Sequence, residues 1–272
     1  MIAGCSQIKV SKNGAEKIAI IIPARLDSQR LPNKVLLEFA GLPMIEHVRR
    51  RGLLNSFSVP VYVASGDDQI LNLVESFGGT AIKTYLEHSD GLSRVNEASD
   101  KLNFQHYIIL QGDEILSLPS DIDQLIREII GSPSVDIWNQ TTALSHENEL
   151  KDESIVKCTV DTSGQIFSIF RKSPLTSNSK LQLKLISKIC GLFAISKIVL
   201  VAINQKKATP LQIAESIEQL RFLEYGLRIN SLSSKFNFPS INVPEDVEKV
   251  KEVLKGSPLQ TQILNDVLSF TP

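Results

Sequence analysis

The stretch that decides the fold runs from Lys17 to Leu54 and reads KIAIIIPARLDSQRLPNKVLLEFAGLPMIEHVRRRGLL. It opens with Lys17–Pro23, a continuous and largely β-branched apolar run that is typical of a strand covered on both faces. Pro43 then stands at the favoured first-turn position of a helical stretch. The order of strand, long loop and helix predicts the first unit of an α/β layered domain.

The same alternation continues along the next sixty residues. Val59–Ala64 and Tyr107–Leu110 are short apolar runs that predict two further buried strands. Between them, Asp67–Phe77 begins with acidic residues and ends at two glycines, as a helix does. We therefore expect a mostly parallel sheet with helices on both faces.

The pattern changes beyond Trp138. Ile155–Val160 and Gln165–Phe170 alternate between apolar and polar residues, and the segment between them is a hairpin turn signal, which predicts an antiparallel excursion. Helical periodicity returns at Pro210–Tyr225 and at Pro244–Leu254. No linker separates these parts. We expect a polar, poorly ordered tail over residues 1–16 and one domain over 17–272, with the antiparallel segment at about 150–205.

Composition excludes several classes of protein. The 272 residues are 42% hydrophobic and 22% charged, as in ordinary globular proteins. Lys and Arg total 29 against 30 for Asp and Glu, so no net charge attracts nucleic acid. No run reaches the roughly 18 apolar residues that span a bilayer, so no membrane insertion is expected. The three cysteines have neither zinc spacing nor disulfide density, which indicates a reducing, cytoplasmic setting.

Two polar segments directly follow predicted strands, where ligands bind in open α/β sheets. The loop after the first strand carries Arg25, Arg30 and Lys34, which are able to converge on a polyphosphate. Asp113 follows the strand that ends at Leu110, and a carboxylate there suits Mg²⁺. Together they predict a nucleoside triphosphate site. Each feature alone has a simpler interpretation, a solvated loop or a turn residue.

These segments resemble the 3-deoxy-manno-octulosonate (Kdo) cytidylyltransferases, also called CMP-Kdo synthetases. The family's opening is close to I-I-P-A-R-x-x-S-x-R-L-P-x-K, and the likeness spans nearly everything from Lys17 to Leu254. The further matching segments are Gly41–Ile45 with His47 and Val48, Gln111–Glu114, Val156-Lys157, the turn before Arg171, Glu218–Arg221 and Pro244–Asp246.

The resemblance implies a nucleotide-diphospho-sugar transferase-like fold, a homodimer built by the antiparallel segment, and transfer of CMP from CTP to a sugar acid for lipopolysaccharide or surface polysaccharide synthesis. Mg²⁺ would be held by Asp113 with Asn242. Catalysis would rest on Arg25, Lys34 and Asp113. The residues implied to contact ligands are Ala24, Arg25, Ser28, Arg30, Lys34 and Arg94 on the nucleotide side, and Gln111, Arg171, Glu218 and Gln219 on the sugar side.

The chain departs from the family pattern mainly on the sugar side. Asn242 stands where the family carries a metal-binding Asp, which removes one formal charge. Ile189 and Phe193 replace a His and a Tyr, and both changes remove hydrogen-bonding capacity. Other differences are Asp90, Leu92 and Ser93 within the family's Ser-Gly-Thr-Glu-Arg segment, and Gln212 in place of a Glu.

These departures leave three interpretations open. The first is a Kdo-type cytidylyltransferase, acting on Kdo itself or on a modified sugar acid. The second is a paralogue that binds nucleotide without catalysis, and the third is a transferase that uses another nucleotide. The sequence alone does not identify the sugar acid.

Overall fold

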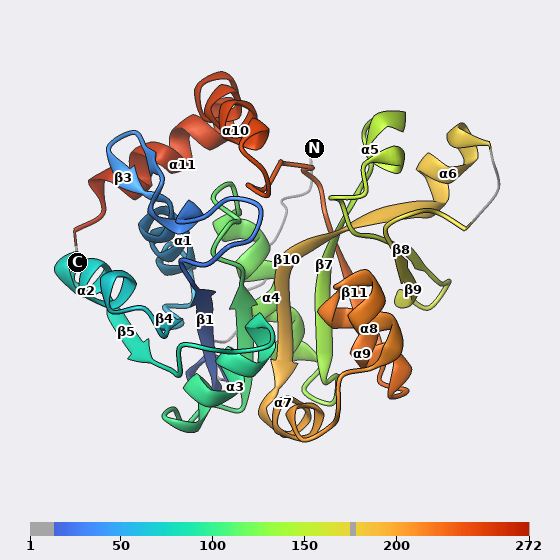
Figure 1. Ribbon diagram of the computed structural model, residues 1–272, viewed down its shortest axis with the longest axis horizontal. Helices are drawn as coiled ribbons and strands as arrows, with labels where there is room; N and C mark the ends of the chain where they lie inside the picture. Colours follow the sequence, from blue (N-terminus) through green and yellow to red (C-terminus); the bar gives the residue numbers. More distant parts are fainter. Residues whose placement is uncertain (1–13, 175–177, 272) are drawn as a thin grey trace, which may run out of the picture.

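A computed structural model describes residues 14–174 and 178–271 of the chain (Figure 1). Within these residues a single sheet has the strand order β5-β4-β1-β6-β10-β7-β11-β9-β8. A separate small hairpin pairs β2 (Glu38–Phe39) with β3 (Leu42–Pro43). The strands of the main sheet are β1 (Ile18–Ala24), β4 (Val61–Ser65), β5 (Thr80–Lys83), β6 (His106–Leu110), β7 (Ile137–Ala143), β8 (Lys157–Val160), β9 (Gln165–Phe170), β10 (Ile186–Ser196) and β11 (Ile229–Ser234).

Helices cover both faces of the sheet (Figure 1). They are the 3₁₀-helices η1 (Ala15–Lys17) and η2 (Lys34–Leu36), followed by α1 (Met44–Leu53), α2 (Asp68–Ser76), α3 (Gly91–Asp100), α4 (Pro119–Gly131), α5 (Glu147–Lys151), α6 (Ser179–Leu185), α7 (Lys197–Asn204), α8 (Pro210–Glu215), α9 (Glu218–Glu224), α10 (Glu245–Gly256) and α11 (Pro258–Ser269).

Strand β1 shows why the fold has three layers. All seven of its residues are buried. Ile18, Ile20 and Ile22 belong to one core cluster, together with residues of α1, α2, α4 and α10. Ala19 and Ile21 belong to the opposite cluster, with residues of α3, α7 and α9. Alternate side chains point to opposite faces of a strand, so a continuous apolar run is what a centrally placed, doubly covered strand requires.

Strands β5, β4, β1 and β6 run parallel to one another, as the alternation predicts. Strand β10 then runs antiparallel to β6 and to β7. Its first residues, Ile186–Lys188, also pair with β8, whereas Leu192–Ser196 pair with β6. The register against β7 shifts between Ile189 and Phe193. Beyond β10 the sheet is mixed, because β11 runs parallel to β7 and antiparallel to β9. The bulge in β10 therefore lies where the parallel half of the sheet meets the mixed half.

Two expected segments differ in detail from the structure. Pro210–Tyr225, predicted as one helical stretch, is divided into α8 and α9 by Ser216, whose φ is 52°. A residue with a left-handed backbone conformation ends the helical hydrogen bonding. The apolar periodicity of the sequence therefore runs across Ser216, although the helix is interrupted there. The expected tail overlaps η1, in which Ala15 is buried. Residues 1–13 of that tail lie outside the described residues.

Candidate active site

The loop after β1 places its basic residues at the carboxyl end of the parallel strands. Leu26 donates a backbone hydrogen bond to Asp67 Oδ2 (3.1 Å), which fastens the loop to the end of β4. The Arg25 side chain is 48% exposed, and its Nε lies 3.5 Å from Asp27 Oδ1. A surface pair of this length restrains an arginine only weakly. Arg25 is therefore held close to the sheet while its charge stays available to a ligand.

Lys34 and Asp113 meet directly, as their positions after β1 and β6 predict. Lys34 Nζ lies 2.6 Å from Asp113 Oδ2 and also donates to the carbonyl of Ile241 (3.2 Å). Arg30 Nη2 donates to the next side chain, Asn242 Oδ1 (2.9 Å). The two implied metal ligands, Asp113 and Asn242, are thus neighbours, each contacted by one cation of the loop. Their oxygens form a hard donor set, which suits Mg²⁺.

A pocket of about 560 Å³ opens beside Asp113 and Asn242. Its size falls within the usual range of small-molecule sites. The bulge of β10 forms one wall, because the Gly191 amide donates to Glu114 Oε1 (2.8 Å). A Cβ at this glycine would come within 2.6 Å of the same oxygen, so no side chain fits there. The other polar residues of the lining include Asn148, Glu149, Asp152, Ser154, Lys188, Gln219, Asn237, Ser240, Asp246 and Lys249.

Most of the pocket lining was not among the predicted site residues, and Glu114 and Lys188 are two of these unpredicted residues. Glu114 is partly buried, and the burial of its carboxyl group, followed by the charge of Asp113, raises the pKa of that group. Lys188 enters from β10, far along the chain from the loop and from Asp113. The Gln111–Glu114 segment itself pointed to Glu114. No sequence signal marked Lys188, because the bulge that brings it to the pocket has no simple periodicity.

The implied sugar-side residues divide between the pocket and its surroundings. Gln219 lines the pocket and donates to Asn139 Oδ1 (3.2 Å). Glu218 instead faces the start of α3, where its Oε1 accepts from the Gly91 amide (2.7 Å). Burial, and then the charge of Asp90, raises the pKa of Glu218 to about 7. Gln111 borders this same glycine, with its Nε2 3.6 Å from the Cβ that a side chain there would have.

Two implied ligand arginines bond to the protein backbone. Arg94 is 3% exposed and donates to Thr84 Oγ1 (2.7 Å) and to the carbonyls of Tyr85 (3.1 Å) and Leu86 (3.0 Å). Arg171 donates through Nε, Nη1 and Nη2 to the carbonyls of Glu215, Glu153 and Ser216. Neither lines the pocket. Each has a clear positioning role, because it fixes the course of a loop.

The departures from the family pattern fall in different surroundings. Ile189 lines the pocket, whereas Phe193 is 1% exposed and packs against Phe222, with ring centroids 6.5 Å apart. Gln212 Nε2 donates to Asp90 Oδ2 (3.3 Å). Asp90 and Gln212, two of the positions that depart from the family pattern, therefore contact each other through a carboxylate and an amide group.

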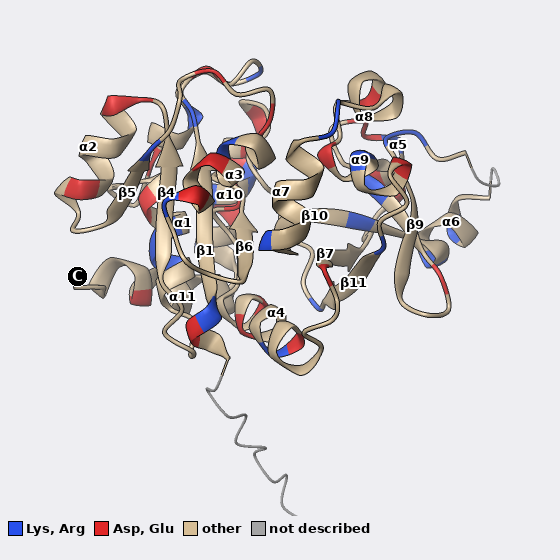
Figure 2. Cartoon of the chain, turned by 90° about the horizontal axis from the view of Figure 1, so that it is seen from below, with Lys and Arg blue, Asp and Glu red and all other residues tan. Residues whose placement is uncertain are grey.

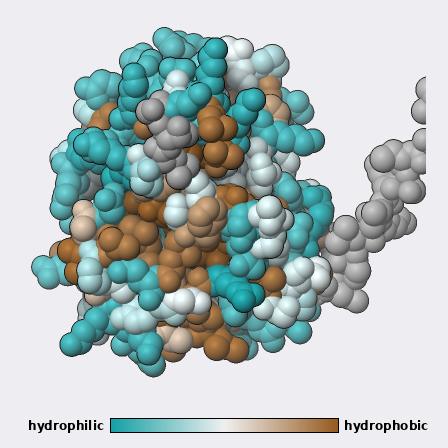
Figure 3. Space-filling view, turned by 90° about the vertical axis from the view of Figure 1, so that its right-hand side faces the viewer, coloured by the Kyte–Doolittle hydropathy of each residue, from teal (hydrophilic) through white to brown (hydrophobic). Residues whose placement is uncertain are grey.

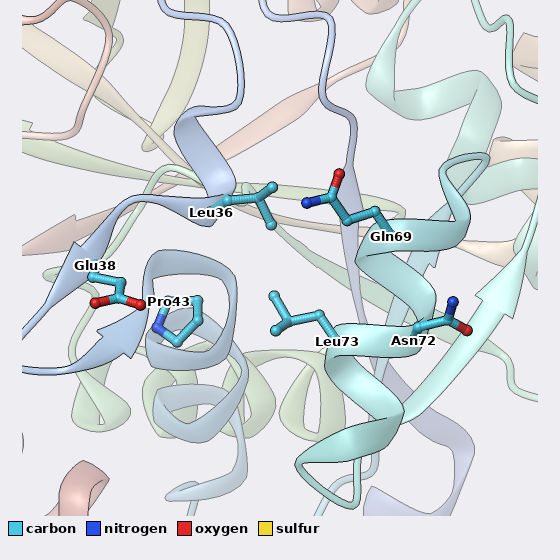
Figure 4. A pocket seen from close by; sticks show the side chains of 6 residues that line it. All are labelled: Leu36, Glu38, Pro43, Gln69, Asn72 and Leu73. Atoms are coloured by element: carbon cyan, nitrogen blue, oxygen red, sulfur yellow. The ribbon is translucent and has the colours of Figure 1, made fainter.

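A second hollow, of about 660 Å³, lies between η2, the β2–β3 hairpin and α2 (Figure 4). Leu36 and Leu73 point toward its centre from opposite sides, and Gln69 points toward Leu36 (Figure 4). Its lining also includes Glu38, Pro43 and Asn72. It contains none of the predicted site residues and no cation, so we assign the candidate site to the pocket beside Asp113.

Three observations bear on partners and cofactors. Basic and acidic residues are interspersed along the helices and loops in the view of Figure 2. None of the described helices is both long and apolar enough to cross a membrane. In residues 14–174 and 178–271 no three His, Cys, Asp or Glu side chains cluster as a metal centre would require. A Mg²⁺ ion needs no such cluster, because it takes one or two protein oxygens and completes its shell with water and phosphate oxygens.

Comparison with known proteins agrees with this geometry. The family model described as Cytidylyltransferase matches residues 19–229. The 3-deoxy-manno-octulosonate cytidylyltransferase of Escherichia coli is 34% identical over 238 residues, covering 88% of this chain and 96% of the relative. The enzyme of the same description from Chlorobium phaeobacteroides is 32% identical over 250 residues, covering 90% and 100%.

Solved structures show the same fold. A CMP:2-keto-3-deoxy-manno-octonic acid synthetase complexed with CTP superposes with a TM-score of 0.81 at 33% identity, covering 88% of this chain and 98% of that one. A cytidylyltransferase from Leptospira borgpetersenii superposes with a TM-score of 0.60 at 14% identity, which shows a shared fold.

Proposed function

The chain belongs to the cytidylyltransferase family, and we propose that it transfers CMP from CTP to Kdo or a close relative of Kdo, with release of pyrophosphate. The product would supply lipopolysaccharide or surface polysaccharide assembly. The carrying observation is that Asp113 and Asn242 line one pocket, where Lys34 contacts Asp113 and Arg30 contacts Asn242. CTP is a cytoplasmic metabolite, so we assign the reaction to the cytoplasm.

The proposed reaction is a substitution at the α-phosphorus of CTP. A hydroxyl oxygen of the sugar acid forms the new bond to phosphorus, the bond to the leaving pyrophosphate breaks, and the hydroxyl proton is released. The protein has to align the two reactants and offset the charge of the leaving group. Arg25 and Lys34 are the cations we assign to that charge. The remaining proposed nucleotide contacts are Ala24, Ser28 and Arg30, with Arg94 holding the neighbouring loop.

Mg²⁺ is the cofactor that the donor set suits, with Asp113 and Asn242 as its proposed protein ligands. When bound, the ion would neutralise phosphate charge and orient the triphosphate. Asn242 contributes an oxygen without a formal charge, so the protein would hold the ion more weakly than two carboxylates do. The carboxylate of Asp113 is then the main protein ligand.

For the sugar acid we propose the side of the pocket that α9 and β6 form. Gln111 and Gln219 offer amide groups there, and Glu218 supports the start of α3 beside them. Arg171 joins β9 to the turn before α9, which positions these residues. Ile189 adds an apolar surface to the lining, so the accepted acid would differ from Kdo at the group that faces it.

We also propose a homodimer. Figure 3 shows apolar surface gathered on the face that carries α5, α6, β8 and β9. Phe167 of β9 is 62% exposed, and Leu181 and Leu185 of α6 are 43% and 52% exposed. Large apolar side chains grouped on one face usually mark an interface. Sedimentation of the full chain should give twice the monomer mass, and a Phe167→Asp variant should sediment as the monomer.

A second candidate function is a nucleotide-binding paralogue without turnover. It is favoured by one contact, the hydrogen bond from Arg30 to Asn242 Oδ1 (2.9 Å), which occupies a proposed metal ligand. The two candidates agree on CTP binding and differ only in pyrophosphate release.

The test is pyrophosphate release from each of the four nucleoside triphosphates, with Mg²⁺ and a panel of sugar acids that includes Kdo and its amino-substituted relative. Turnover restricted to CTP supports the proposal, and turnover with another nucleotide would identify a different transferase. If no sugar acid of the panel gives pyrophosphate release while CTP still raises the melting temperature, the result favours the paralogue without turnover. Asp113→Ala is the control, because it should abolish release in a folded protein.

A further inference from the structure

The pocket beside Asp113 is lined by two lysines whose charges are balanced differently. Lys249 Nζ lies 2.8 Å from Asp246 Oδ1 and is thus paired with a carboxylate. Lys188 Nζ donates to the Phe238 carbonyl (2.9 Å) and lies 3.4 Å from Asn237 Oδ1, both of them neutral groups. Among the described residues, no ion pair includes Lys188. Its charge acts on the Glu114 carboxyl group from beyond ion-pair distance, which partly offsets the rise in the pKa of that group, and its ammonium group has no carboxylate partner at contact distance among the described residues.

Two other basic residues near this side of the pocket, Lys157 and Arg171, direct their charged groups at backbone carbonyls. Lys157 is fully buried and donates to the carbonyls of Asp152 (2.6 Å), Ile155 (3.0 Å) and Arg171 (2.8 Å). Arg171 donates to three carbonyls in turn, and it lies outside the pocket lining. To bind a carboxylate in the pocket, Arg171 would have to leave these partners. Lys188 already lines the pocket and has a donor to spare, since an ammonium group carries three.

The position of Lys188 in β10 connects it to the reacting end of the pocket. It pairs with Lys157 of β8 and Thr142 of β7, three residues before Gly191. Gly191 contacts Gln111 through its carbonyl (2.8 Å) and Glu114 through its amide (2.8 Å). Strand β10 therefore contacts the segment that contains Asp113 through Gly191. Three residues earlier, the same strand places Lys188 in the lining of the pocket. Lys188 and Asp113 both line the pocket, and its volume of about 560 Å³ suits a small acid.

We infer that Lys188 binds the carboxylate of the sugar acid and is a specificity-determining residue of the site. The inference rests on the proposed function, because it assigns one group of that substrate. Lys188 replaces Arg171 as the cation that selects an acid over a neutral sugar. The carboxylate would be an ion-pair partner at contact distance and take the position of a third hydrogen-bond partner of the ammonium group.

The first test measures binding of Kdo by calorimetry, with the enzyme saturated by Mg²⁺ and a non-hydrolysable CTP analogue. Lys188→Met is expected to weaken Kdo binding at least about 30-fold, the usual cost of removing one partner of a buried charged pair. Lys188→Arg should recover part of this loss. Lys249→Met is the matched comparison, with an expected change of no more than about 3-fold, because Asp246 already neutralises its charge.

The second test distinguishes a direct contact from a general disturbance of the pocket. The methyl ester of Kdo lacks the negative charge, so the wild-type protein should prefer the acid strongly. Lys188→Met should remove most of this preference, whereas Arg171→Met should retain it. A merely structural lysine would weaken acid and ester alike. An unchanged preference in Lys188→Met, or its loss in Arg171→Met alone, overturns the inference.

The two proposals fail in different ways. If Kdo binds and its binding depends on Lys188 but no pyrophosphate is released, the catalytic proposal fails and the assignment of Lys188 stands. If Kdo turns over equally well in Lys188→Met, the function stands and the assignment fails. If the wild-type protein binds neither Kdo nor its amino-substituted relative, the assignment is also wrong. Binding of CTP, measured by melting temperature, should be unchanged in Lys188→Met in every case.

Discussion

In the loop that follows β1, the basic side chains end mainly at side-chain oxygens or in solvent, although Lys34 also donates to the Ile241 carbonyl. Across the pocket, most of the basic side chains end at backbone carbonyls. Arg30 and Lys34 contact Asn242 and Asp113, groups that a bound ion or phosphate can rearrange. Arg171 and Lys157 each donate to three carbonyls, which no ligand replaces. Residue type alone therefore does not distinguish a ligand-binding cation from a structural one. The distinction lies in what the protein offers each cation as a partner.

The largest effect should come from removing a cation of the loop. Lys34→Met is expected to lower kcat/KM about 10²- to 10³-fold, because a preorganised charge beside the leaving group contributes about that much. The melting temperature should change little, since Asp113, the partner of Lys34, is partly exposed to water. Pyrophosphate release and thermal unfolding measure the two effects. Lys251→Met, which breaks the exposed pair with Glu248, is the control and should affect neither.

A Lys34→Met variant with a lowered melting temperature and unchanged pyrophosphate release would contradict the contrast between the cations of the loop and those across the pocket. It would place Lys34 with the structural cations, and the charge of the triphosphate would then have to be balanced elsewhere.

Arg171→Met should show the opposite profile. Three backbone carbonyls lose a donor, so we expect the free energy of unfolding to fall by about 1–2 kcal/mol and the melting temperature by about 3–6 °C. Binding of CTP should be unaffected. Thermal unfolding with and without CTP measures both. Lys172→Met is the matched neighbour, because its side chain is 80% exposed and pairs with Glu153 at the surface. Equal melting temperatures for the two variants would contradict a structural role for Arg171.

The adjacency of Lys34 and Asp113 could be predicted from the sequence, because both follow parallel strands whose carboxyl ends share one edge of the sheet. The wall that carries Lys188 could not. It depends on a bulge in an antiparallel strand and on the close approach of Gly191 to Glu114, and neither leaves a periodic pattern. The roles of Arg94 and Arg171 were equally hidden, since a carbonyl partner belongs to the backbone and is present at every residue.

A smaller effect should follow from restoring a carboxylate at the proposed metal site. In Asn242→Asp, a second charged oxygen would bind the ion more strongly, and the Mg²⁺ concentration for half-maximal stabilisation by CTP should fall about 3- to 10-fold. Arg30 would also pair with the new carboxylate, which limits the gain. The Mg²⁺ titration is repeated in Arg30→Met with Asn242→Asp, where the gain should be larger. An unchanged requirement in both variants would show that position 242 does not face the metal.

The smallest effect concerns Glu218, a buried carboxyl group that faces a backbone amide as Arg171 faces carbonyls. Its pKa is about 7 in the folded protein, raised mainly by burial above the usual value of 4.5. The folded state therefore binds the proton more tightly than the unfolded chain. The resulting stabilisation is fully present below about pH 4.5 and is lost as the pH rises through 7.

Glutamine resembles the protonated form of Glu218 and does not titrate. The melting temperature of Glu218→Gln should thus rise relative to the wild type between pH 5 and pH 8. Glu224→Gln, on the same helix, should show no such trend. Burial acts to raise the pKa of Glu224, but hydrogen bonds from Thr209 and from two backbone amides outweigh it and lower the pKa overall, so this carboxylate stays ionised from pH 5 to pH 8. A constant difference between Glu218→Gln and the wild type would mean that Glu218 is already ionised at pH 5, with a counter-charge from the cations of the loop.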